Sequence, residues 1–184
     1  GAGDGDVNEP IRDSYVSRVR WLVANLLTAL LGATIITSFG GAIEKLVALA
    51  ALSPMVASIG GNAGTQTMAV AVRALATNQL TRANTGRILW RELRVAMLNG
   101  ATVATLIGLA TMLVFASPLL GAVIAAAVLT NIVTAGLAGV IVPVTLDRMG
   151  QDPAVASSVF VTMITDSMGF FAFLGLAVAS GLVG

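Results

Sequence analysis

A single carboxylate in the apolar C-terminal part of the chain is the first candidate for chemistry. Asp166 is the only charged residue between Pro153 and Gly184. Placing an aspartate deep in a bilayer costs about 2.5–3.5 kcal/mol on translocon scales, so such a group is expected to face a water-filled path or a cation. No Lys or Arg falls at a comparable position in the other apolar segments. The alternative is a protonated Asp166 that is hydrogen-bonded to Ser or Thr on a neighbouring helix.

The other polar groups of the apolar segments carry oxygen. These groups are the numerous Ser and Thr hydroxyls and the side-chain amides of Asn25, Asn62, Gln66, Asn99 and Asn131. Cys and His are both absent, which excludes disulfides, thiolate chemistry and imidazole metal ligands. Oxygen-only sites suit hard cations such as Mg²⁺, Ca²⁺ or Na⁺.

Enzymatic and nucleic-acid functions find no support. The chain has no Ser-His-Asp arrangement, no pair of acids within one apolar segment and no phosphate-binding loop. Its net charge of +1 gives no reason to expect a nucleic-acid partner. We therefore expect that this chain is not an enzyme.

A second unusual stretch is "PMVASIGGNAGTQT", residues 54–67. It combines a proline, three glycines and two amides, namely Pro54, Gly60, Gly61, Gly64, Asn62 and Gln66. Proline removes a backbone donor and is predicted to bend or break the helix. Broken backbone at membrane depth survives only where it is buried in protein or lines a wet cavity. Asn62 and Gln66 share one helix face, while Gly60-x-x-x-Gly64 also fits close helix packing, so pore lining and packing both remain open.

The elements that would position these groups are membrane-spanning helices. Hydrophobic residues make up 57% of the chain and charged residues 10%, whereas soluble domains carry about a quarter charged residues. Charge-free runs cover residues 21–43, 46–72 and 95–146, and one span needs roughly 20 apolar residues. The segments are too long for transmembrane strands and lack their alternation. This composition predicts an all-α membrane protein.

Two Pro-containing pairs divide the rest of the chain. Ser117-Pro118 splits the longest run, because proline starts a helix better than it continues one. Asp152-Pro153 is an N-cap acid followed by proline at the first helical position. We therefore predict five spans at about residues 21–38, 46–76, 94–116, 119–146 and 153–183.

The basic residues predict the orientation of these spans. With the N-terminus inside, nine arginines lie on the cytoplasmic side and only Lys45 lies opposite, as expected from the excess of Lys and Arg in cytoplasmic loops. Trp21 and Trp90 then both fall at the cytoplasmic interface, where indole rings concentrate. The predicted topology is N-in and C-out, in the inner membrane of a cell.

The first residues, "GAGDGDVNEP", are acidic and Gly-rich and contain no signal peptide. We expect a flexible stretch, with residues 1–20 forming the end of a truncated cytosolic linker and residues 21–184 forming the transmembrane domain. A natural mature N-terminus is the alternative.

Several motifs together resemble the MgtE family of Mg²⁺ channels and transporters. They are P-x-x-x-x-x-G-G-N-x-G-x-Q at residues 54–66, "RAL" at 73–75, "RELRVAMLNG" at 91–100 and "GQDPAVASSVFVTMITDSMG" at 150–169. The resemblance covers residues 10–184. The Gly-Asn-Gln motif, followed at this spacing by D-P and T-x-x-D, is fairly specific.

The resemblance implies a homodimer with five transmembrane helices per subunit and a pore at the subunit interface. The selectivity aspartate of the family matches Asp166, and a backbone carbonyl at the same site would come from Thr162. The D-P aspartate matches Asp152 near the cytoplasmic mouth. Cytosolic N-terminal and CBS domains that sense Mg²⁺ would precede this chain, and only the tail of their connecting helix, around residues 8–19, would be present.

We assign further residues to the same sites. Asn62, Ser158 and Thr165 are placed with the pore group, and Glu92 is placed with Asp152 at the cytoplasmic mouth. The family often has Asn-Pro where this chain has Ser158-Val159, so a hydroxyl replaces an amide and a proline kink is lost. This departure bears on the geometry of the cytoplasmic half of the pore but leaves Asp166 unchanged.

The leading functional hypothesis is a Mg²⁺-selective channel that passes hydrated divalent cations down their electrochemical gradient. Mg²⁺ dehydrates reluctantly and keeps several waters, and rings of Asp are used in cation-selective pores. One acid per subunit cannot form a cage, so two copies are expected to face each other. An ion-coupled secondary transporter and a non-transporting membrane anchor are the alternatives.

Overall fold

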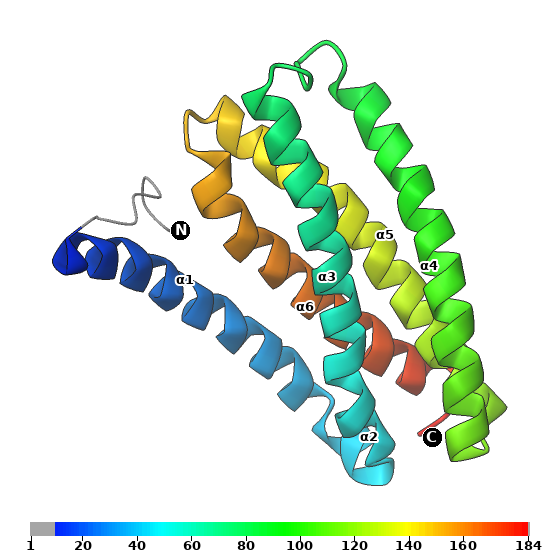
Figure 1. Ribbon diagram of the computed structural model, residues 1–184. Coiled ribbons are helices and arrows are strands. Elements are labelled where there is room, and N and C mark those ends of the chain that lie inside the picture. The colour runs from blue at the N-terminus through cyan, green and yellow to red at the C-terminus, as the bar shows by residue number, and fades with distance from the viewer. Residues whose placement is uncertain (1–9, 184) are drawn as a thin grey trace.

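The computed structural model describes residues 10–183, and every regular element in this range is an α-helix. The helices are α1 (Ile11–Ser38), α2 (Gly40–Lys45), α3 (Ala48–Ala76), α4 (Thr85–Phe115), α5 (Pro118–Arg148) and α6 (Pro153–Ala179) (Figure 1). The all-α prediction is confirmed. The expected flexible stretch at residues 1–9 lies outside the described residues.

The helix starts at the two Pro-containing pairs are as predicted. The Oγ of Ser117 accepts a hydrogen bond from the backbone N–H of Leu120 at 3.2 Å. The Oδ1 of Asp152 accepts one from the backbone N–H of Ala154 at 2.9 Å. In each case a side-chain oxygen satisfies one of the free N–H groups of the first turn, and the following proline needs no partner.

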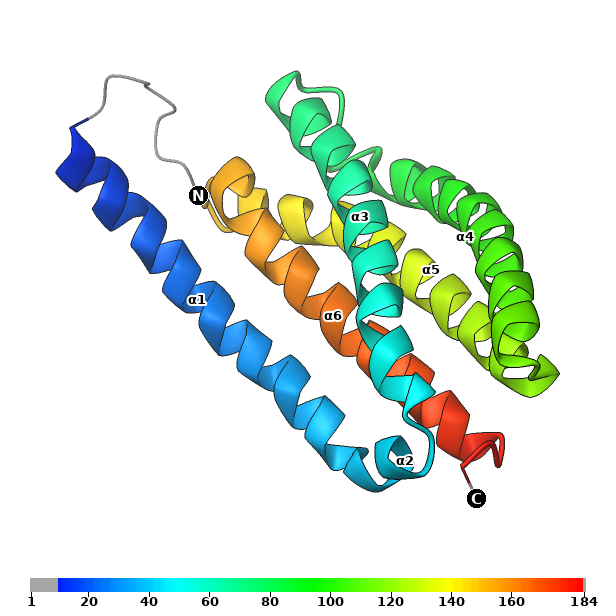
Figure 2. The ribbon, with the colours of Figure 1, turned by 60° about the horizontal axis from the view of Figure 1, so that its bottom comes forward.

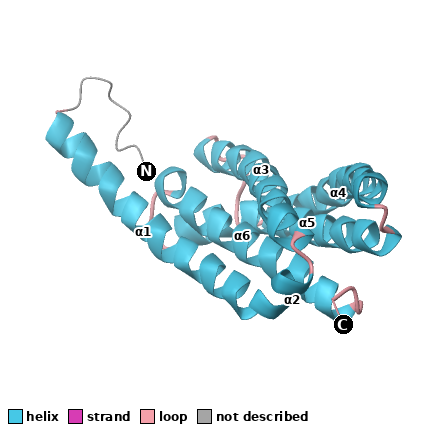
Figure 3. Ribbon diagram, turned by 90° about the horizontal axis from the view of Figure 1, so that it is seen from below, coloured by secondary structure: helices cyan, strands magenta, loops and turns pink. Residues whose placement is uncertain are grey.

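Helix α5 is the centre of the bundle. Helices α3, α4 and α6 all pack against it, and α3 also packs against α6. Helix α1 packs mainly on α6 and lies at the opposite edge of the molecule from α4 (Figures 2 and 3). Helices α3 and α4 are joined by a short loop, yet each packs on α5 rather than on the other.

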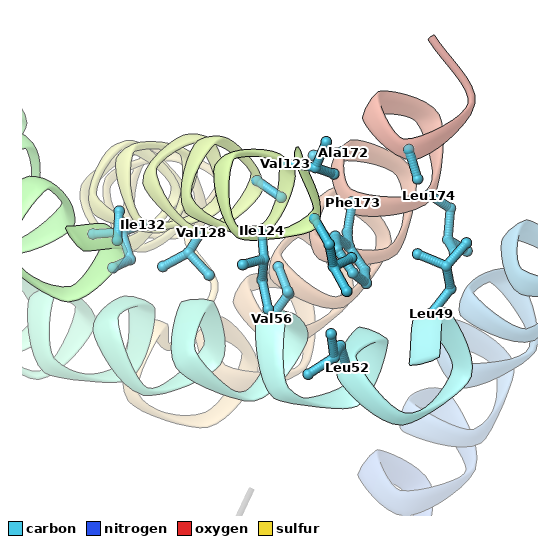
Figure 4. Close-up of a cluster of buried hydrophobic side chains, with 14 of the residues drawn as sticks. Leu49, Leu52, Val56, Val123, Ile124, Val128, Ile132, Ala172, Phe173 and Leu174 are labelled. Atoms are coloured by element: carbon cyan, nitrogen blue, oxygen red, sulfur yellow. The ribbon is translucent and has the colours of Figure 1, made fainter. Parts of the chain in front are cut away.

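Small residues allow α4 and α5 to approach closely. A Cβ added at Gly121 would lie 2.6 Å from the carbonyl oxygen of Gly108, and one added at Gly136 would lie 2.7 Å from the Cβ of Ala96. Such contacts are typical of helices that associate in membranes, where packing replaces the hydrophobic effect as the driving force. The largest buried cluster includes Val56, Ile124 and Phe173 from α3, α5 and α6 (Figure 4).

Four of the helices are long and apolar enough to cross a membrane: α1, α4, α5 and α6. Helix α3 covers 29 residues, but its glycines, hydroxyls and amides keep it out of this group. Four of the five predicted spans are therefore confirmed by length and composition. Helix α1 also begins at Ile11, so residues 11–20 of the predicted linker are continuous with the first span.

The predicted helix break at Pro54 is wrong. Helix α3 continues through this residue from Ala48 to Ala76. Its neighbours Leu52, Ser53 and Val56 are buried against the bundle, and the Ser53 hydroxyl donates to the carbonyl oxygen of Leu49 at 2.6 Å. Packing of this kind allows the proline to remain inside a membrane helix, although the carbonyl oxygen that Pro54 leaves without an N–H donor is that of Ala50 and not that of Leu49.

Candidate functional site

A polar stripe runs along one face of α6. Ser158, Thr162 and Asp166 are spaced by four residues, so they lie above one another on the helix surface. Ser158 is exposed, whereas Thr162 and Asp166 are partly buried. Helical rise places Asp166 about 21 Å from Asp152. Asp166 therefore lies well inside an apolar segment.

The stripe faces α1 across a cavity of about 340 Å³. Ser158 and Thr162 line it from α6, and Arg18, Trp21 and Asn25 line it from α1. Four residues beyond Asp166, the ring of Phe170 closes the space against α1, since a Cβ on Gly32 would lie 3.2 Å from its Cε2.

Asp166 lies between this cavity and the Phe170 contact. Within residues 10–183 its carboxylate has neither a hydrogen bond nor an ion pair. A carboxylate in an apolar segment needs such a partner or an ion. Its surroundings therefore favour an ion or water as the missing partner.

The carbonyl oxygen of Thr162 and the side chain of Thr165 interact with each other. The hydroxyl of Thr165 donates to the carbonyl oxygen of Thr162 at 3.1 Å. Inside α6 this oxygen also accepts the helical hydrogen bond from the backbone N–H of Asp166, so both of its lone pairs are engaged. Thr165 itself is fully buried and lies next to α3, where a Cβ on Gly61 would be 3.8 Å from its Oγ1. Thr165 thus lies in the protein interior and outside the cavity beside α1.

Asn62 and Gln66 lie elsewhere. Both line a cavity of about 440 Å³ between α3 and α4, together with Asn99 and Thr102. Within one chain the structure does not bring Asn62 into the cavity that Ser158 and Thr162 line. The prediction that the two amides share a face is confirmed.

Two of the three glycines of α3, Gly60 and Gly64, serve close packing. A Cβ on Gly60 would lie 2.1 Å from the Nδ2 of Asn131, and one on Gly64 would lie 2.7 Å from the Cγ1 of Val161. These glycines contact α5 and α6, while Asn62 and Gln66 line a cavity toward α4. Close packing is therefore shown for Gly60 and Gly64, while pore lining by Asn62 and Gln66 stays a prediction.

The two residues predicted for the cytoplasmic mouth occupy different environments. Asp152 is exposed at the N-terminus of α6. Glu92 is buried on α4, forms an ion pair with the neighbouring Arg91, and lines a cavity of about 250 Å³ with Gln66 and Asn99. Asp152 does not line the cavity that Glu92 lines, and the shared role of the two acids at the cytoplasmic mouth stays a prediction.

Asn131 has a structural role between helices that the sequence did not indicate. It is fully buried on α5, and its Nδ2 donates to the carbonyl oxygen of Val56 at 3.0 Å. Its Oδ1 is buried without a partner in the described structure. The only feature of the sequence that could have pointed to this role is the presence of an amide side chain in an apolar run.

No group of three or more acidic side chains converges within residues 10–183. In a single chain, a cation at Asp166 would therefore take its other ligands from hydroxyls, carbonyls or water. Mg²⁺ accepts such an arrangement, because it usually keeps several waters and binds proteins through one or two carboxylates.

Comparison with known proteins adds a family relationship. The family model MgtE, described as a divalent cation transporter, matches residues 53–176. Proteins named magnesium transporter MgtE are 32% identical over 162 residues in Bacillus subtilis and over 163 residues in Thermus thermophilus. These alignments cover 88% and 89% of this chain but 36% of each relative. The chain therefore spans about a third of the length of the curated relatives it matches.

Proposed function

The chain belongs to the MgtE family of divalent cation transporters, and we propose that it forms the membrane pore of a Mg²⁺ channel. It is a multi-pass protein of the cell membrane. In this proposal hydrated Mg²⁺ passes down its electrochemical gradient, and Asp166 provides the main binding group. The observation that carries the proposal is the carboxylate of Asp166, which has no partner within residues 10–183 and lies in an apolar helix, one turn beyond Thr162, which lines a cavity.

Five spans and an N-in orientation are part of the proposal. Helix α3 is as long as the helices beside it and packs between α5 and α6. The start of α1, the α3–α4 loop and the α5–α6 loop lie toward one end of the bundle, while α2 and the α4–α5 turn lie at the other (Figure 1). The nine arginines belong to the first end and Lys45 to the second, which agrees with the rule that cytoplasmic ends are basic.

A second copy of the chain would complete the ion site. One carboxylate per chain cannot surround an ion, whereas two Asp166 residues facing each other could hold a hydrated Mg²⁺ through its water shell. Much of α1 is apolar and exposed, including Leu22, Leu26 and Leu30, and this surface is available to lipid or to the partner subunit. Cytosolic domains in the rest of a longer protein would then regulate this pore.

The test is Mg²⁺ uptake into proteoliposomes with an imposed membrane potential. The wild type should conduct, and Asp166→Asn should lose most of the flux or the preference for Mg²⁺ over Ca²⁺. Glu44→Gln is the matched control, because Glu44 is an exposed acid on α2. Equal flux in the wild type and Asp166→Asn would refute the assigned role of Asp166.

The same assay separates a channel from an ion-coupled transporter. A channel gives flux that depends on the voltage and the Mg²⁺ gradient alone. Flux that requires a second gradient, of protons or Na⁺, would replace the channel proposal with coupled transport. A folded chain that shows no flux under any gradient would support the membrane-anchor alternative.

A further inference from the structure

The space between α3 and α4 is a continuous polar trough. The two cavities there share Ala63, Gln66, Asn99 and Ile132 as lining residues, so they adjoin. Helix α5 forms the floor through Ile132, and Gly136 extends that floor in the cavity at Glu92. From Arg91 to Thr102 the trough extends about 16 Å along α4, at 1.5 Å per residue.

The lining of this trough is unusually polar for a membrane helix pair. The cavity at Glu92 is lined by one carboxylate, one guanidinium, one hydroxyl and two amides: Glu92, Arg91, Thr67, Gln66 and Asn99. Gln66 and Asn99 lie within predicted spans, where polar groups are expensive unless water, an ion or protein satisfies them. A concave site with a few converging polar groups is the usual form of a binding site.

The ion pair of Glu92 leaves its carboxylate open to exchange. The side chain of Glu92 is 8% exposed, but that of its partner Arg91 is 65% exposed. Consecutive residues on a helix do not face each other, so the Arg91 side chain must bend back to reach Glu92. The exposed guanidinium can return to solvent when the pair opens, but the buried carboxylate of Glu92 then needs another cation. A cation that enters the cavity could therefore replace the guanidinium.

The size and chemistry of the cavity fit a hydrated divalent cation. Six waters at about 30 Å³ each occupy about 180 Å³, and the cavity at Glu92 holds about 250 Å³. A carboxylate with amide and hydroxyl oxygens is the ligand type that hard cations prefer.

We propose that the Glu92 cavity is a second binding site for hydrated Mg²⁺, separate from Asp166. The carboxylate of Glu92 binds the ion or its water shell, and the amides of Gln66 and Asn99 accept or donate the remaining hydrogen bonds. Arg91 acts as a built-in competitor that occupies the carboxylate when the ion is absent. This proposal does not depend on the pore function, because binding is measurable in protein that does not conduct.

The test is Mg²⁺ binding to the purified 184-residue chain, measured by titration calorimetry in an Asp166→Asn background. This background removes binding at the α6 stripe. Adding Glu92→Gln should weaken the remaining binding at least tenfold. Adding Arg91→Gln should instead tighten it several-fold, because the competing cation is gone. Glu44→Gln and Arg94→Gln are the matched controls, since both side chains are exposed and neither lines the cavity.

The opposite expected effects of Glu92→Gln and Arg91→Gln on Mg²⁺ binding separate an ion site from a structural ion pair. If the pair only holds the fold, Arg91→Gln would leave binding unchanged or weaken it, and either result overturns the proposal. No Mg²⁺ binding in the Asp166→Asn background, or equal binding after Glu92→Gln, would also overturn it. If Glu92→Gln does not fold, Arg91→Gln alone decides, because its side chain lies mostly outside the core. Failure of the Asp166 flux test would leave these binding results unaffected.

Discussion

The side-chain amide of Asn131 donates a hydrogen bond to the main-chain carbonyl oxygen of Val56, 3.0 Å away, and so joins α5 to α3. Helix α6 meets them at the same point. A Cβ on Gly169 would lie 2.8 Å from the Nδ2 of Asn131 and 2.9 Å from the Cα of Ala57. Gly169 lies one turn beyond Asp166, so this junction of three helices helps to position the carboxylate.

Asn131→Ala should therefore destabilise the bundle. The substitution removes a buried hydrogen bond and leaves a small cavity, for an expected loss of about 1–2 kcal/mol in the free energy of unfolding. Denaturation of the purified protein in SDS, followed by circular dichroism, measures this loss. Asn25→Ala is the control, since Asn25 is exposed on α1. Equal effects of the two substitutions would contradict the role given to Asn131.

Local chemistry explains what the sequence predicted well. The starts of α5 and α6 depend on Ser117 and Asp152 and on the proline that follows each, and these signals lie within four residues of chain. The face shared by Asn62 and Gln66 follows from helical periodicity alone. Such features need no knowledge of neighbouring helices.

What the sequence could not predict is a matter of tertiary contact. Pro54 does not break α3, because buried neighbours hold the helix together. Asn62 and Asn131 look alike as amides in apolar runs, but Asn62 lines a cavity beside α4 and Asn131 joins three helices. Thr165 is one residue from Asp166 and yet lies in the interior. Only the packing of α3, α5 and α6 separates these cases.

Asp152 allows its capping role to be separated from its predicted role at the pore mouth. Asp152→Ala should lower the free energy of unfolding by about 1 kcal/mol, because the hydrogen bond to the N–H of Ala154 is lost. Asp152→Ser keeps a capping hydroxyl and should retain most of the stability. If the carboxylate also attracts cations, both variants should reduce Mg²⁺ flux in proteoliposomes at low Mg²⁺. Normal flux in Asp152→Ser would restrict this residue to capping.

The proposed subunit interface is testable through introduced cysteines. The chain has no native cysteine, so Asp166→Cys places one thiol on each copy. A short bifunctional thiol reagent should link two chains in membranes, because the two positions face each other across the proposed pore. Leu113→Cys is the control, since Leu113 is 77% exposed on α4, far from the proposed axis. Linking at Leu113 but not at Asp166 would place the interface elsewhere.

Two adjacent glycines provide the sharpest test of how α3 packs. A Cβ on Gly60 would lie 2.1 Å from the Nδ2 of Asn131, while the nearest atom to a Cβ on Gly61 is the Oγ1 of Thr165 at 3.8 Å. Gly60→Ala should therefore cost about 1–3 kcal/mol through overpacking, and it should displace the Asn131 amide. Gly61→Ala meets ordinary contact distances and should be neutral or stabilising, because alanine favours a helix by about 1 kcal/mol over glycine. Unfolding in SDS measures both. Equal costs at the two positions would mean that α3 is rotated from the orientation described, and that Asn62 and Gln66 do not line the trough beside α4.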